Sequence, residues 1–192
     1  MTLDFDLDTA DFSRAVTYVF ENSHKTLPEV LNRGALTAII GGRGVRGAMQ
    51  RTPRAAREAI LAVPVDQVAR MVMAKHRGEK MSRLRVKQLI RKEYARRIAA
   101  IGYTATLGWN NAAIAFGGTG VKGHGPGKGY YEFGSGKVAT LSDLVAEGTN
   151  TTPAAAFIGE QPMQEALDDV AEDRVEFWGG RIDEVLTRAG AK

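Results

Sequence analysis

A glycine-rich stretch near the middle of the chain contains the pattern most often associated with nucleotide chemistry. Residues 118–123 read Gly-Thr-Gly-Val-Lys-Gly and match the G-x-G-x-x-G of dinucleotide-binding loops. Such a loop binds a pyrophosphate only when a helix begins directly after it, because the helix N-terminus supplies N–H donors. More glycines and Pro126 follow here, so no helix is expected to begin and a nucleotide site is not predicted. Gly127-Lys128-Gly129 also lacks the hydroxyl residue that follows the lysine of a phosphate loop.

The other residue types that carry out chemistry are scattered along the chain. His24, His76 and His124 have no second ligand at a spacing typical of a metal site. Asp168 and Asp169 are adjacent on a predicted helix, and adjacent helical positions do not face each other, so a paired acid and base is not expected. The absence of cysteine excludes disulfides, thiolate ligands and cysteine nucleophiles. We therefore expect a protein that is not an enzyme and that uses no metal or other cofactor.

Charged residues are segregated along the 192-residue chain, although its net charge is only +4. The first eleven residues and the last predicted helix are acidic, whereas residues 70–97 contain eleven lysines or arginines and two glutamates. Segregation of this kind concerns partners rather than fold. It favours head-to-tail contact between copies or a basic face against nucleic acid. Ordinary solvated helix faces are the remaining alternative.

The basic segment contains seven candidate contact residues for a neighbouring subunit or for DNA. Cations placed beside phosphates would give a salt-dependent affinity. Stacking on single strands needs aromatic groups among the charges, and base readout needs amides, yet Gln88 and Tyr94 are the only such residues in the segment. Any DNA contact is therefore predicted to be nonspecific, and an acidic protein surface is an equally open partner. The seven candidates are Arg83, Arg85, Lys87, Arg91, Lys92, Arg96 and Arg97.

Hydrophobic periodicity predicts that most of the chain is helical. One predicted helix has Thr52 as its cap and Pro53 in its first turn. Another is basic and ends at Gly102. Residues 65–75 fit either a helix or a strand. The predicted helices cover residues 8–22, 27–50 (with a break near Gly41-Gly42 as one option), 54–62, 79–101 and 162–189.

The region between residues 103 and 152 gives strand and loop signals instead. Residues 130–133 and 137–141 read as short strands around a Gly-Ser-Gly turn, and residues 149–156 read as a linker. Residues 117–140 are expected to form a flexible arm or hairpin. The predicted fold is α+β, with helices packed on a small antiparallel sheet and a long glycine-rich arm. Residues 1–192 are expected to form a single domain.

The chain contains no run of about 18 apolar residues, so no membrane span is predicted. Its acidic start differs from the basic start of a signal peptide, so secretion is not expected either.

Three groups of short motifs occur in a fixed order along the chain. Residues 31–35 read Leu-Asn-Arg-Gly-Ala, and residues 52–55 read Thr-Pro-Arg-Ala about twenty positions later. Residues 96–103 and 108–112 read Arg-Arg-Ile-Ala-Ala-Ile-Gly-Tyr and Gly-Trp-Asn-Asn-Ala, and residues 163–167 open a long amphipathic helix. Together these segments resemble tailed-phage proteins of the minor tail protein Z and tail-completion type, over most of the chain.

The resemblance implies a non-enzymatic structural protein of the virion. Such a protein completes the tail or joins the tail to the head as a homo-oligomeric ring at the neck, with a hexamer as one option. The implied partners are other neck and tail proteins, with nonspecific contact to packaged DNA as an option. The implied location is the virion, after assembly in the host cytoplasm. The alternatives are a basic nucleic-acid-binding protein acting in packaging or regulation, and another minor capsid or tail-tube component.

Overall fold

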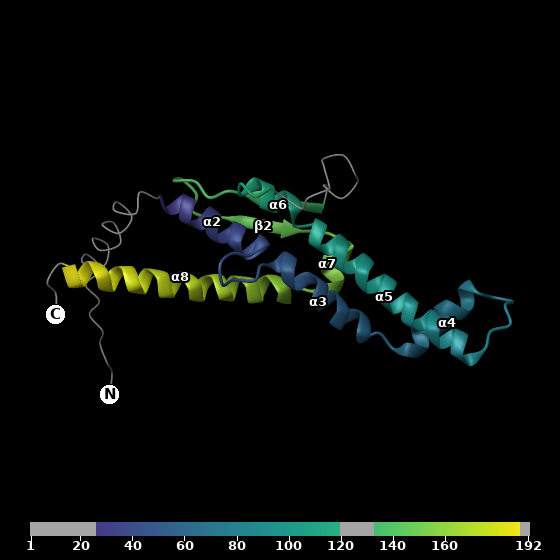
Figure 1. Ribbon diagram of the computed structural model, residues 1–192. Helices are drawn as coiled ribbons and strands as arrows, with labels where there is room; N and C mark the ends of the chain where they lie inside the picture. Colours follow the sequence, from purple (N-terminus) through teal and green to yellow (C-terminus); the bar gives the residue numbers. More distant parts are fainter. Residues whose placement is uncertain (1–25, 120–132, 189–192) are drawn as a thin grey trace, which may run out of the picture.

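The computed structural model describes residues 26–119 and 133–188, in which helices surround a small two-stranded sheet (Figure 1). The predicted α+β class is confirmed at this level. The predicted helix at residues 8–22 and the centre of the predicted arm lie outside the described residues. The helices are α2 (Leu27–Ile40), α3 (Ala48–Leu61), α4 (Val65–Lys75), α5 (Arg83–Leu107), α6 (Asn110–Ala115), α7 (Pro153–Ile158) and α8 (Gln161–Arg188). The strands are β1 (Gly134–Lys137) and β2 (Glu147–Asn150), and they pair antiparallel.

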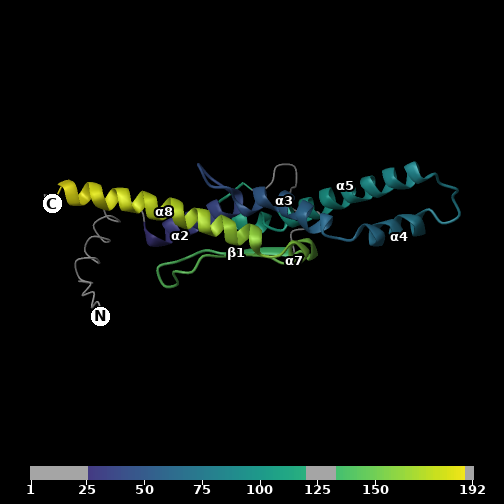
Figure 2. The ribbon, with the colours of Figure 1, turned by 90° about the horizontal axis from the view of Figure 1, so that it is seen from below.

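The described part of the molecule is elongated, with different elements at its two ends. Helices α4 and α5 lie side by side and project from one end in both views (Figures 1 and 2). Helix α8 begins near the middle, lies along α2 and α3, and extends to the opposite end. The hairpin formed by α4 and α5 is therefore far from the distal half of α8.

Helix α2 begins at a capping box and ends at a glycine. The Thr26 backbone N–H donates to the Glu29 carboxylate at 2.7 Å, while the Thr26 hydroxyl accepts from the Glu29 backbone N–H. Gly41 ends the helix with a φ of +89°, a conformation that favours glycine. The helix therefore breaks at Gly41-Gly42, which was one of the two options that the sequence left open.

The predicted start of the next helix at Thr52-Pro53 is wrong, because α3 already begins at Ala48. Thr52 is buried inside the helix, and its hydroxyl donates to the Ala48 carbonyl at 2.7 Å instead of capping the start. Pro53 lies early in α3, where its missing N–H removes one backbone hydrogen bond.

The predicted end of the basic helix at Gly102 is also wrong, because α5 continues to Leu107. Gly102 is buried where α5 crosses α3, and a Cβ there would lie 3.4 Å from Pro53 Cα and 3.5 Å from Ala56 Cβ. The glycine therefore permits a close helix crossing rather than a stop. The ambiguous segment at residues 65–75 is helix α4, and residues 76–78 form the turn that follows it.

The strand and loop signals after residue 103 were largely misread. Residues 103–115 are the end of α5 and helix α6, and the expected linker at residues 149–156 contains the end of β2 and most of α7. The expected Gly-Ser-Gly turn lies within strand β1, whereas residues 138–141 form no strand. A Cβ on Gly136 would lie 2.7 Å from Ala115 Cβ and 3.1 Å from Ala112 Cα, so β1 packs directly on α6 through its glycines.

The hydrophobic core lies where α2, α6 and α8 meet the sheet. Ile39, Ala112, Ala113 and Phe116 are its buried centre, and Trp109 packs against them while half-buried. The predicted final helix at residues 162–189 is confirmed as α8. Within the described ranges, no helix is both long and apolar enough to cross a membrane.

Candidate interaction surfaces

The basic residues predicted to contact a partner lie on a helical hairpin whose inner face is apolar. Val68 and Val72 of α4 are buried, and the Tyr94 hydroxyl of α5 donates to the Val63 carbonyl at 2.8 Å. Ser82 caps α5 by accepting from the Arg85 backbone N–H at 3.2 Å. We call residues 65–97 the basic hairpin. It contains eleven lysines or arginines against three acidic residues, a net charge of +8.

A buried carboxylate ties the two helices of the basic hairpin together. Glu93 of α5 has a side chain that is only 8% exposed. Its two oxygens accept from Lys75 Nζ of α4 at 3.1 Å each. Arg96 donates to the same carboxylate at 2.7 and 3.1 Å, and Arg97 Nε donates at 3.0 Å.

This environment keeps Glu93 ionised. The hydrogen bond from Arg96 is the largest influence that holds the Glu93 pKa well below its ordinary value of 4.5, and Arg97 and Lys75 act in the same direction. Burial opposes them, but it does not outweigh them. From the sequence, Glu93 is one of two glutamates in a basic segment, and its cluster with three cations is not predicted. Its spacing from Arg96 and Arg97, three and four positions along a helix, was the signal that could have revealed the cluster.

The seven predicted contact residues therefore separate into two groups. Arg96 and Arg97 are turned toward Glu93, and Arg97 Nη2 also lies 2.9 Å from Met71 Sδ. The other five are exposed, and their side chains form no hydrogen bond or ion pair with any residue that the structure describes. These five are Arg83, Arg85, Lys87, Arg91 and Lys92.

The basic hairpin also exposes apolar side chains between its charges. Leu84 of α5 is 67% exposed. Val65 and Met73 of α4 are exposed as well. The surface of the basic hairpin therefore offers a partner both cations and large apolar groups.

Helix α8 carries the opposite charge. Near its start it is tied to α3 by Arg51, which donates to Glu165 at 2.6 Å and also forms an ion pair with Asp169. We call residues 168–176 the acidic segment of α8. It contains five acidic residues and one arginine, and Val170 is its buried anchor to α2.

Three acids of this segment have no ion-pair partner among the side chains described in residues 26–119 and 133–177. These three, Glu172, Asp173 and Glu176, are also exposed. Asp168 accepts only a neutral hydrogen bond, from Gln164 at 2.9 Å. Val175 lies between these acids and is 74% exposed, so this surface too combines one sign of charge with an apolar group.

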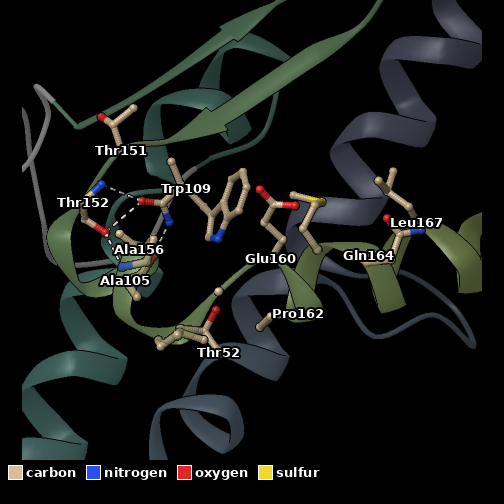
Figure 3. A pocket seen from close by; sticks show the side chains of 15 residues that line it. Thr52, Ala105, Trp109, Thr151, Thr152, Ala156, Glu160, Pro162, Gln164 and Leu167 are labelled. Atoms are coloured by element: carbon tan, nitrogen blue, oxygen red, sulfur yellow. Dashed lines mark hydrogen bonds between the residues drawn. The ribbon is translucent and has the colours of Figure 1, made fainter. Parts of the chain in front are cut away.

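A cavity of about 500 Å³ lies between the end of α5, helix α7 and the start of α8 (Figure 3). The Thr152 backbone N–H and hydroxyl donate to Asn150 Oδ1 at 3.2 and 2.9 Å, and Asn150 Nδ2 donates to the Ala105 carbonyl at 2.7 Å. The Trp109 ring forms part of the wall.

The polar groups of this cavity are used to hold its wall together. Glu160 is the one titratable side chain among the described residues that line the cavity. The described lining has no histidine, lysine or second carboxylate beside Glu160. Among the described residues, no three histidine or acidic side chains are placed to hold a metal ion.

Comparison with protein-family models, curated proteins and solved structures finds no match for the chain. The features that bear on function are the two oppositely charged surfaces and the short motifs.

Proposed function

We propose that the chain is a non-enzymatic structural protein of a tailed-phage virion. In this proposal it completes the tail or joins the tail to the head, as one subunit of a ring at the neck. The observation that carries the proposal is the division of the surface into a basic hairpin at one end and an acidic helix at the other. A subunit whose two ends are complementary suits repeated heterologous contacts, and such contacts close into rings or extend into filaments.

The positions of the family-like motifs support the assignment to this class of virion protein. Thr52 is buried in α3, and Pro53 of the same motif packs against Gly102 of the Ile-Gly-Tyr motif in α5. Trp109 of the Gly-Trp motif packs on the central hydrophobic cluster. These four residues of the motifs are packing positions in the fold, so this part of the resemblance concerns packing and not only short surface patterns.

The composition of purified particles tests the proposal. Quantitative mass spectrometry of virions produced from the genome that encodes this chain should find it at a fixed number of copies per particle. That number should match a single ring rather than the many copies of a capsid or tube protein. A chain that is abundant in infected-cell extract and absent from purified particles would refute the proposal.

A second candidate function is nonspecific binding of nucleic acid during packaging or regulation. The five exposed cations of the basic hairpin favour it, since none is neutralised by another described residue. Binding should then weaken steeply with salt, because each phosphate contact releases counterions. Titration of duplex DNA at two salt concentrations tests this candidate. It is rejected if no binding is measured at the lower salt concentration.

A further inference from the structure

We propose that the basic hairpin of one copy binds the acidic segment of α8 on a second copy, in a head-to-tail contact. This inference rests on the part of the proposed function that makes the chain a self-assembling subunit. It goes further by assigning the two surfaces that meet and the residues at their centres.

Both surfaces combine an exposed apolar residue with charges of one sign on neighbouring helix positions. Leu84, Lys87 and Arg91 of α5 are spaced by three and then four residues, so they form one stripe. On α8, Glu172 lies three positions before Val175 and four positions before Glu176, so it neighbours both side chains on the helix surface. Leu84 and Val175 are 67% and 74% exposed, which leaves both free to be covered by a partner.

The basic and the acidic surfaces cannot meet within one copy. The basic hairpin projects from one end of the molecule, and the acidic segment lies on the part of α8 that extends toward the other end (Figures 1 and 2). A contact between them must therefore join two copies. The growing assembly always keeps one free basic end and one free acidic end, so the contact is heterologous and repeats.

The exposed Leu84 favours a protein partner over nucleic acid. Phosphates would be satisfied by Lys87 and Arg91 alone, whereas the exposed Leu84 gains nothing from a phosphate backbone. An acidic helix with a central valine offers both charge complementarity and apolar cover. Because α8 of this chain has that composition, a second copy is the occupant that the observations favour.

Engineered cysteines give a direct test, since the natural chain has no cysteine that could interfere. The variants Leu84→Cys and Val175→Cys are purified separately, mixed in equal amounts and exposed to a short bis-maleimide cross-linker. The mixture should give a dimer band that neither variant gives alone. Ile114→Cys, at a half-exposed position on α6 away from both stripes, is the matched control and should give no dimer with either variant.

Charge reversal identifies the forces in the contact. Lys87→Glu/Arg91→Glu and Glu172→Lys/Glu176→Lys should each weaken self-association at least tenfold, because like charges then face each other. Mixing the two double variants should restore association, since each then offers the surface that the other needs. The control Arg43→Glu/Arg57→Glu lowers the net charge as much as the hairpin reversal does, at positions away from both stripes. This variant should associate normally. The melting temperatures should stay within a few degrees, because none of the reversed side chains has a described partner.

The possible outcomes separate this inference from the proposed function. If the wild-type chain associates and both reversed variants associate equally well, the contact lies elsewhere, and the inference is wrong while the virion proposal stands. A wild-type chain that stays monomeric at all concentrations, with no mixed cross-link, also overturns the inference. If the hairpin reversal abolishes duplex DNA binding and leaves association unchanged, the basic hairpin serves nucleic acid instead. Detection of the chain in virions is decided separately by particle composition.

Discussion

Replacing Glu93 with glutamine should loosen the basic hairpin without changing its shape. The amide keeps the size of the side chain but removes the charge that Lys75, Arg96 and Arg97 share. After the change, three cations remain close together around a neutral group that is 8% exposed in the natural chain. The hairpin then loses the ion pair between Lys75 of α4 and Glu93 of α5.

The structure allows the size of this loss to be estimated. A buried hydrogen bond to a charged group contributes about 1.5–3 kcal/mol. Lys75 and Arg96 are at least half exposed and can return to water, so they add little to the loss. Arg97 is largely covered and cannot be resolvated as easily. We therefore expect Glu93→Gln to lower the free energy of unfolding by about 2–3 kcal/mol at neutral pH.

The effect should depend on pH in a defined direction. The pKa of Glu93 is lowered in the folded state, so the unfolded state binds more protons as the pH falls. The stabilisation is fully present above the ordinary glutamate pKa of 4.5, and it is lost as the pH falls from there toward the folded-state pKa. The difference between wild type and Glu93→Gln should therefore be constant near pH 7 and shrink below about pH 4.5.

Urea unfolding of both proteins between pH 7 and pH 3 measures this difference. Glu79→Gln is the control, since Glu79 is 62% exposed and pairs only with His76, so its loss should cost about 0.5 kcal/mol or less. The reasoning is refuted if Glu93→Gln is as stable as the wild-type chain at neutral pH. It is refuted equally by a stability difference that does not change down to pH 3.

Three further substitutions test the packing that positions the two surfaces. Gly108→Ala should destabilise the fold by about 1–3 kcal/mol, because the new Cβ would lie 2.0 Å from Asn150 Oδ1. A thermal melt measures this loss, and an unchanged melting temperature would contradict the packing at Gly108. Trp109→Ala should cost about 2–3 kcal/mol, less than for a fully buried tryptophan because the ring is half-buried, and the same melt checks it; no loss would mean that the ring contributes nothing to the core. Arg51→Met should cost about 1–2 kcal/mol and speed hydrogen exchange in the first half of α8, since it removes both ion pairs to that helix; unchanged exchange would show that α8 is held by its apolar face alone.

The existence of α2, α3, α5 and α8 and the charge layout were predictable from the sequence because both depend on local patterns. The periodicity of the final segment predicted α8, and Gly41-Gly42 marked a break that φ at Gly41 explains. The basic and acidic segments could be found by counting charges. Their placement at opposite ends could not, because it depends on how α3, α5 and α8 pack together.

The central region was misread because glycine has two structural uses. The local pattern predicts a helix end at Gly102 and a turn at Gly134-Ser135-Gly136, because glycine commonly ends helices and forms turns. In the structure, Gly102 and Gly136 let neighbouring backbones approach closely, at the α3–α5 crossing and under α6. Whether a glycine breaks an element or permits close packing depends on the tertiary neighbour, which no local pattern contains.

Electron microscopy of purified virions tests the central claim most directly. A reconstruction of the neck should place the chain in a symmetric ring between head and tail, with neighbouring copies arranged head to tail. Purified particles whose neck and tail are fully accounted for by other proteins, with no density for this chain, would contradict the claim.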